Sequence, residues 1–546
     1  MDKKSRHTLE FDKILDRLAQ YTSFSAGNAL ARQVKPTLDL DEAKLWQAET
    51  QEARALFDRQ PSVTLGGARD IRRTADNAMR GYILAPEDLL EVRATISSAR
   101  DLRRKLVKQV DSYPRLATIA ELIEECPGIV SAISQALDDR GMVLDSASPE
   151  LAKIRRELNI VHGRIQDKLQ ALINSSQNQY LQEPTITTRG GRYVVPLQAN
   201  HKGRIKGIVH DQSNSGATLW IEPLNTVELN NDYRGLQLAE NEEVQRILAE
   251  LSAHVALQGE SIKRAVDRLA ELDLIFARAH YANAIDALQP ELVPWRDVQS
   301  NNPHPGSTLW IKGARHPLLD PDFVVPTDLL LNEDIFIVLI TGPNTGGKTV
   351  SLKTTGLMVL MAQSGMHLPA VDAKLTVFED VFADIGDEQS IEQNLSTFSG
   401  HMNNITRILE QADDRCLVLL DELGAGTDPA EGAALAQAIV SFLRDKGATT
   451  FVATHFPELK VYASQTPGAT NASLLFDVET LMPTFEMSIG MPGRSNAFAI
   501  ARRLGVSESI LDEALELVGA SSSKAESLLD SIYEMREKIT SQEAGT

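Results

Sequence analysis

The sequence predicts a multidomain protein in which an α-helical region with a small β-containing insertion is followed by an α/β domain. Three observations support this fold class. Before residue 300, apolar residues recur at steps of three and four over long stretches, which is typical of amphipathic helices. After residue 306, short apolar strands alternate with helical stretches, which is the pattern of βαβ units. The length of 546 residues also allows about two to four domains.

The composition is that of a globular protein. Hydrophobic residues make up 42% and charged residues 24% of the chain, which is close to ordinary usage. No apolar run reaches the roughly 18 to 20 residues that span a bilayer, and no apolar stretch follows the charged N-terminus, so we expect neither a membrane protein nor a signal peptide. Only two cysteines are present, Cys126 and Cys416. They cannot form a disulfide framework, and the reducing cytoplasm is the expected location.

Residues 1–130 are predicted to be mostly helical, and nothing in them suggests chemistry. Two long helices are predicted after them. One carries an apolar stripe between Leu151 and Leu172, and the other carries a similar stripe between Val244 and Leu269. These two helices flank a segment of different character, residues 184–223.

This intervening segment is predicted to contain short strands at residues 192–197 and 207–210, joined by Gly and Asn turns. The whole chain has 75 acidic and 55 basic residues and a formal net charge of −20. Residues 184–210, here called the basic segment, contain no acidic residue. Such a segment is either a solvated hairpin or a contact for the phosphate backbone of a nucleic acid, which needs cations but no base readout. Its candidate contacts are Arg189, Arg192, Lys202, Arg204 and Lys206.

The first strand of the α/β part, residues 334–340, leads directly into a G-x-x-x-x-G-K-[ST] motif. The glycines of such a motif let main-chain N–H groups surround a phosphate at the amino end of a helix. Lys348 would reach the β- and γ-phosphates of ATP, and Thr349 would offer its hydroxyl to Mg²⁺. A Gly-rich turn without a ligand is the alternative. The predicted nucleotide-binding residues are Gly342, Pro343, Asn344, Thr345, Gly346, Gly347, Lys348, Thr349 and Val350.

Two further strands, residues 415–420 and 448–453, end in polar residues at the edge where α/β sheets bind ligands. Asp421 would hold Mg²⁺, and Glu422 would orient or deprotonate the attacking water. His455 would hydrogen-bond the γ-phosphate, and Gln389 would touch the metal or its water. Each residue alone is more often structural, and the interpretation depends on their order along the chain. The predicted catalytic residues are Lys348, Glu422 and His455.

The order of these motifs resembles that of an ABC-type ATPase, and their particular residues resemble those of the MutS family. The sequences that carry this likeness are residues 341–344, 396–402, 421–427 and 453–456. The middle of the chain is similar to the type 2 bacterial branch of that family, at residues 191–196, 211–219, 221–223 and 230–231. The resemblance extends from residue 8 to about residue 519.

The resemblance implies a domain order and a homodimer. A helical core would occupy residues 1–130, and lever helices with a clamp at about 184–223 would occupy residues 131–300. An ABC-type ATPase domain would follow at 301–519, and a C-terminal helix would start in 520–546. ATP and Mg²⁺ would bind at two composite sites, where Ser396 of one subunit faces the γ-phosphate held by the other. The basic segment would then lie at the clamp, with DNA held inside the dimer.

We therefore expect an ATPase that acts as a dimeric clamp on branched DNA and suppresses recombination. We do not expect the mismatch-reading N-terminal domain of repair-type relatives, nor mismatch recognition. Members of this branch are also associated with collided ribosomes, so an ATP-driven ribosome-rescue factor that binds rRNA is an alternative, and a nucleotide-switched scaffold is another. The small MutS-related nuclease domain of type 2 members is not expected here, and their endonuclease activity is not carried over.

Overall fold

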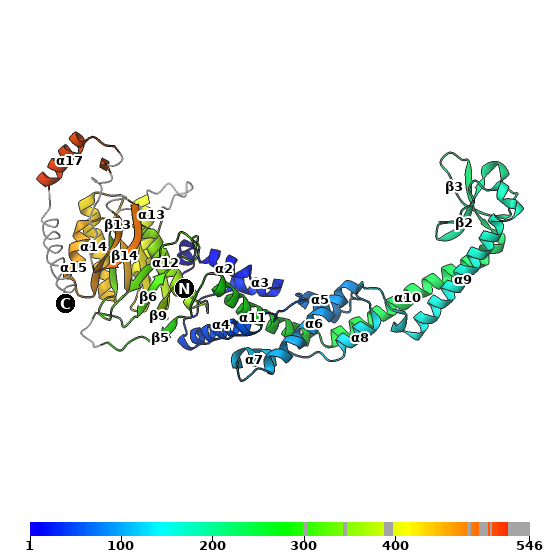
Figure 1. The fold of residues 1–546 in the computed structure, drawn as a ribbon, viewed down its shortest axis with the longest axis horizontal. Helices are drawn as coiled ribbons and strands as arrows, with labels where there is room; N and C mark the ends of the chain where they lie inside the picture. Colours follow the sequence, from blue (N-terminus) through cyan, green and yellow to red (C-terminus); the bar gives the residue numbers. More distant parts are fainter. Residues whose placement is uncertain are drawn as a thin grey trace. The chain divides into compact units, whose positions relative to one another are not determined.

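The computed structural model describes residues 1–298, 303–341, 347–386, 397–477, 482–490, 501–502 and 505–521. The chain forms two compact units (Figure 1). Unit 1 comprises Met1–Thr64, Lys108–Ile119 and the chain from Ala270 onward, and unit 2 comprises Leu65–Val107 and Ala120–Leu269. The expected combination of many helices with several sheets is confirmed. The domain boundaries drawn from the sequence remain a prediction.

Unit 1 begins with helices that the sequence predicts in its first 130 residues. Two helices, α7 (Pro114–Glu121) and α11 (Gly259–Ala284), contain residues of both units. The other helices of unit 1 whose bounds the structure describes are α1 (Lys3–Thr8), α2 (Phe11–Ala19), α3 (Ser25–Gln33), α4 (Leu40–Arg59), α12 (Lys348–Ala362), α13 (Thr397–Gln411), α14 (Pro429–Lys446), α15 (Pro457–Gln465) and α17 (Glu508–Ser521).

Within the described residues, unit 1 contains two sheets. The main sheet has six strands in the order β10-β11-β12-β8-β13-β14, and β14 alone of these runs antiparallel to its neighbour. A smaller sheet has the order β5-β9-β6-β7. The three strands predicted in the α/β part are β8, β11 and β12, which lie side by side. The strands are β5 (Glu291–Val293), β6 (Leu309–Ala314), β7 (Thr327–Leu330), β8 (Ile337–Thr341), β9 (Asp372–Thr376), β10 (Asp380–Asp384), β11 (Cys416–Leu420), β12 (Thr449–Ala453), β13 (Ala469–Asp477) and β14 (Met482–Ile489).

The main sheet is buried on both faces. Val338 and Ile340 of β8 belong to one hydrophobic cluster with residues of α2 and α12, whereas Ile337 and Leu339 belong to another with residues of α13, α14 and α15. Because side chains alternate between the faces of a strand, a strand that is covered on both sides is apolar throughout. The N-terminal helices therefore help to cover the sheet face on which α12 packs, a role that the sequence did not indicate.

Unit 2 contains α5 (Arg72–Met79), α6 (Pro86–Val107), α8 (Ile129–Ala136), α9 (Pro149–Ile173) and α10 (Val227–Leu257). Helix α9 is capped by Ser148, whose hydroxyl accepts a hydrogen bond from the amide of Leu151 at 3.0 Å. The prediction of a single second long helix is wrong. Its apolar pattern continues across a break at Gln258, where α10 ends and α11 begins. Hydrophobic periodicity does not register such a break, because both helices bury the same kind of stripe.

The segment between α9 and α10 forms an antiparallel sheet, here called the insertion sheet, in the order β1-β2-β4-β3. The predicted strands correspond to β2 and β3, but β4 lies between them, so they do not form a hairpin with each other. One face packs against α9 through Ile165 and Leu169, and Figure 1 shows the sheet at one end of the α9–α10 pair. The strands are β1 (Thr187–Arg189), β2 (Arg192–Gln198), β3 (Gly207–Gln212) and β4 (Thr218–Pro223).

Candidate nucleotide site and basic surface

The amino end of α12 brings the predicted phosphate-binding residues to the main sheet. Gly347 is the N-cap of this helix and has a φ of 93°, a left-handed conformation that favours glycine. Lys348 follows it and is only 3% exposed, whereas Val350 is 40% exposed on the outer side of the first turn. The remaining predicted residues of this loop, Gly342, Pro343, Asn344, Thr345 and Gly346, lie outside the described residues.

The amine of Lys348 is subject to opposing influences. Burial lowers its pKa, and the nearby carboxylates of Asp421 and Glu422 raise it. Two acids from the end of β11 therefore act electrostatically on the lysine at the start of α12. The sequence predicted that these residues, more than 70 positions apart, would serve one site, and the structure brings them together.

Thr349 and Asp421 are joined by a hydrogen bond at this site. The Thr349 hydroxyl donates to Asp421 Oδ2 at 2.6 Å. Asp421 is 7% exposed, and burial raises the pKa of its carboxyl group, while the bond from Thr349 opposes that shift. The second oxygen, Oδ1, is buried and has no hydrogen-bond partner among the described residues. A buried carboxylate oxygen without a partner beside a hydroxyl is a donor set that suits Mg²⁺, which binds hard oxygen ligands.

Glu422 and His455 lie at neighbouring strand ends. In the parallel ladder Leu420 of β11 pairs with Val452 of β12, and Ala453 pairs with Ile340 of β8, so the carboxyl ends of the three strands are adjacent. Glu422 and His455 lie two residues after the ends of β11 and β12, and both side chains are exposed. Partial burial of the ring and the charge of Lys348 lower the pKa of His455, although Glu422 opposes the shift.

The backbone at Glu422 is unusual. Its φ is 49°, in the left-handed region that non-glycine residues seldom adopt. Gly424 and Gly426 also have positive φ values, 84° and 87°, so the chain turns sharply after β11. Such conformations are enriched where a side chain has to be presented to a ligand, which is consistent with the role predicted for Glu422.

Two predicted residues of this site, Gln389 and Ser396, lie outside the described residues, so their roles remain predictions. One further residue near this site, Asp384, was not predicted from the sequence. Asp384, at the end of β10, accepts a hydrogen bond from the amide of Asp421 through its main-chain oxygen at 2.8 Å. Its signal in the sequence is a single acid after an apolar run, and only the strand order reveals that β10 is next to β11.

The basic segment divides into two groups. Lys202, Arg204 and Lys206 lie on the connection between β2 and β3, and all three are exposed. Their side chains have no hydrogen-bond or ion-pair partner among the residues that the structure describes. They are therefore available to bind an anion.

The other two cations of the basic segment are already engaged. Arg189 Nε lies 3.3 Å from Asp211 Oδ2, and its guanidinium carbon lies 4.4 Å from the centre of the Trp220 ring. Arg192 donates to both carboxylate oxygens of Glu222, at 2.9 and 3.1 Å. Glu222 is fully buried, so Arg192 stabilises the insertion sheet. The five cations of the basic segment are therefore partly neutralised by Asp211 and Glu222, which β3 and β4 place beside Arg189 and Arg192.

Comparisons with known proteins decide the family. Residues 338–520 match the family model described as MutS domain V. A protein named endonuclease MutS2 from Geobacillus sp. (strain WCH70) is 45% identical over 542 residues, which cover 98% of this chain and 68% of that protein. Another of the same name, from Geobacillus thermodenitrificans (strain NG80-2), is 46% identical over 549 residues, which cover 100% of this chain and 69% of that protein. The chain belongs to the MutS2 family.

Membership of the MutS2 family confirms the resemblance seen in the sequence motifs. The match to MutS domain V begins in β8 and ends in α17, so it includes Lys348, Thr349, Asp421, Glu422 and His455. The expected absence of the small MutS-related nuclease domain is not decided by these comparisons and stays a prediction. Among the described residues, no helix combines the length and hydropathy needed to cross a membrane.

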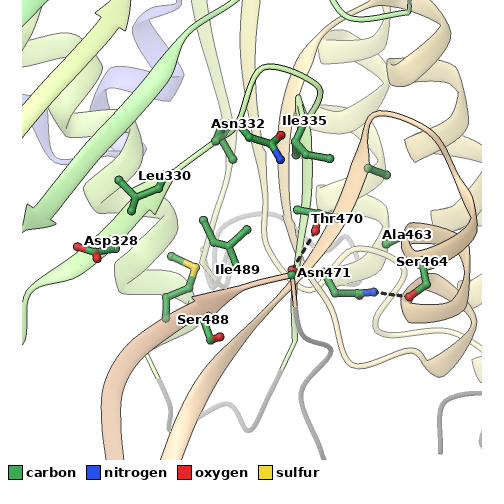
Figure 2. A pocket seen from close by; sticks show the side chains of 14 residues that line it. Asp328, Leu330, Asn332, Ile335, Ala463, Ser464, Thr470, Asn471, Ser488 and Ile489 are labelled. Carbon is green, nitrogen blue, oxygen red and sulfur yellow. Dashed lines mark hydrogen bonds between the residues drawn. The ribbon is translucent and has the colours of Figure 1, made fainter. Parts of the chain in front are cut away.

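A cavity of about 780 Å³ lies elsewhere in unit 1 of this MutS2 chain (Figure 2). It is lined by Ile335, which precedes β8, by Thr470 and Asn471 near the start of β13, and by Ile489 at the end of β14. Figure 2 shows the amide of Asn471 turned toward Ser464, to which its Nδ2 donates at 2.9 Å. The cavity is therefore at the amino ends of β8 and β13, whereas Lys348 follows the carboxyl end of β8.

Proposed function

We propose that this MutS2-family chain binds ATP with Mg²⁺, hydrolyses it, and uses the resulting conformational change to control its hold on DNA. The observation that carries the proposal is the pair formed by Thr349 and Asp421, with an unpartnered buried oxygen, beside the buried amine of Lys348. This arrangement lies in the part of the chain that matches MutS domain V, and MutS-family proteins are ATPases.

The described residues support distinct roles in hydrolysis. Lys348 would contact the β- and γ-phosphates. Thr349 and Asp421 would hold Mg²⁺, which neutralises charge on the phosphate oxygens. The exposed carboxylate of Glu422 would orient the attacking water and accept its proton. His455 would donate a hydrogen bond to the γ-phosphate from the adjacent strand end.

Two substitutions test this assignment. Lys348→Ala should abolish binding of a fluorescent ATP analogue, because the amine contributes to binding the phosphates. Glu422→Gln should leave that binding intact and abolish phosphate release, because only proton transfer is lost. Glu431→Gln, a change of the same kind at an exposed position of α14, is the control and should behave like the wild type.

The outcomes separate the alternatives. A Glu422→Gln protein that fails to bind ATP would contradict the division of roles between Lys348 and Glu422. A wild-type protein that binds ATP but releases no phosphate would favour a nucleotide-switched scaffold.

The nucleic-acid part of the proposal is supported by the exposed cations of the basic segment. Lys202, Arg204 and Lys206 suit a phosphate backbone, which is recognised by charge and not by base sequence. We propose a cytoplasmic homodimer with composite ATP sites, completed by Ser396 in trans, that grips branched DNA and suppresses recombination. Closure of the ATPase domains around nucleotide would move the clamp through rigid helices.

The same cations would also fit rRNA, so ribosome rescue remains the second candidate. A pull-down on a four-way DNA junction and on collided ribosomes, each with and without ATP, distinguishes the two. Retention on the junction alone supports DNA as the partner. ATP-dependent retention on collided ribosomes alone supports ribosome rescue and contradicts the DNA assignment.

A further inference from the structure

The end of β10 carries a buried acid, Asp384, that has no role in the proposed hydrolysis. It is 3% exposed, and both of its carboxylate oxygens are bonded to α13. His401 Nδ1 lies 2.7 Å from Oδ2, and Asn404 Nδ2 donates to Oδ1 at 2.8 Å. His401 and Asn404 are three residues apart, so they lie on one face of the helix. Arg407 donates to Asn404 Oδ1 at 3.0 Å, which fixes the orientation of that amide.

The main chain of Asp384 makes a second connection, to the predicted metal ligand. Asp384 pairs with Leu420 in the parallel ladder of β10 and β11, and its carbonyl accepts from the amide of Asp421 at 2.8 Å. Asp421 in turn accepts from Thr349 at 2.6 Å. One buried residue therefore joins α13 to the strand end at which the ATP site is proposed.

Helix α13 also packs against the loop that presents Glu422. A Cβ atom added to Gly426 would lie 3.4 Å from the Cβ of Phe398, in the first turn of α13. The helix thus contacts this loop at its amino end and is anchored to β10 one turn later. A shift of α13 would move the support of the loop in which Glu422 has its left-handed conformation.

We propose that Asp384 is a positioning residue for ATP hydrolysis, which acts through α13 and through Asp421 to hold the segment that carries Glu422. The inference rests on the proposed ATPase function. The Asp384 carboxylate is fully occupied by α13, so its loss should change turnover and leave nucleotide binding nearly unaltered. A residue that merely stabilises the fold would not produce this separation.

The first test is Asp384→Asn, which keeps the size of the side chain but removes its charge and leaves one acceptor oxygen for the two donors of α13. Its kcat should fall by about tenfold or more, since small errors of alignment are costly in a catalytic site. The KM and the Kd of a fluorescent ATP analogue should stay within about threefold of the wild-type values, because the phosphate-binding residues are untouched.

The partner residue provides a second, independent test. His401→Ala should also lower kcat. The variant that combines it with Asp384→Asn should be little worse than Asp384→Asn alone, because the contact between the two residues is lost in either case. His401→Gln retains an N–H donor that can reach Asp384 and should recover most of the lost rate. Asp372→Asn, at an exposed position at the start of β9, is the control and should match the wild type.

Several results would overturn the inference. They are an unchanged kcat in Asp384→Asn, a parallel rise of KM and Kd, additive effects in the double variant, or no recovery with His401→Gln. If thermal melting shows that Asp384→Asn does not fold, the series at His401 decides the question. Failure of the ATPase proposal is seen separately, in the wild type, as ATP binding without phosphate release, and it would remove this inference as well.

Discussion

Replacing Lys202, Arg204 and Lys206 together with Ala should weaken DNA binding in a manner that depends on salt. All three side chains are exposed, and none has a partner among the described residues, so each can neutralise one phosphate. Each neutralised phosphate contributes about 0.9 to the slope of log K against log salt concentration, so three contribute about 2.7. Between 50 and 200 mM salt, the wild type should lose on the order of 40-fold more affinity than the triple variant.

Fluorescence anisotropy of a labelled four-way junction, titrated at a series of salt concentrations, measures this slope directly. The matched control replaces Arg104, Lys105 and Lys108, three exposed cations at the end of α6 and just beyond it. It removes the same charge from another surface and should leave the slope unchanged. Equal slopes for the wild type and the triple variant at residues 202, 204 and 206 would refute the assignment of this surface to phosphate contacts.

Two further predictions concern buried charges. Arg192→Ala should lower the free energy of unfolding by about 1–3 kcal/mol, because the buried carboxylate of Glu222 loses two hydrogen bonds. Thermal unfolding measures this loss, and an unchanged melting temperature would contradict the prediction. Burial raises the pKa of Glu49 from 4.5 to about 7, against the opposing charge of Arg278. The protonated side chain therefore stabilises the folded state fully below about pH 4.5, and this stabilisation is lost as the pH rises through 7. Glu49→Gln should remove up to about 3 kcal/mol of this pH dependence in denaturant unfolding, and curves parallel to the wild type would exclude it.

The proximity of the proposed nucleotide-site residues could be predicted from the sequence because its signals are local. The glycine loop follows one apolar strand, Asp421 and Glu422 follow a second, and His455 follows a third. The rule that parallel strands end at one edge of the sheet was enough to place them together. The structure agrees for Lys348, Thr349 and Asp421, which are in electrostatic or hydrogen-bonded contact. No local signal marked Asp384, because a single acid acquires its role only through the strand beside it.

The insertion sheet shows the opposite case. Residues 184–210 contain five cations and no acid. Asp211 and Glu222 lie outside this range, but strands β3 and β4 place them beside the cations Arg189 and Arg192. Pairing of β4 with both β2 and β3 brings Glu222 within 2.9 Å of Arg192. The number of cations that remain available is therefore set by strand order, which a linear count does not contain.

The sequence by itself determined the α/β character of the second half, the order of the ATP motifs and the family resemblance, because these depend on residue type, spacing and hydrophobic period. The tertiary structure decided which charges are neutralised, which carboxylate oxygen of Asp421 lacks a partner among the described residues, and that Asp384 connects α13 to the end of β11. Those properties depend on contacts between strands and helices far apart in the chain. The donor and acceptor of a hydrogen bond must lie about 3 Å apart, and only the folded chain shows which groups come that close.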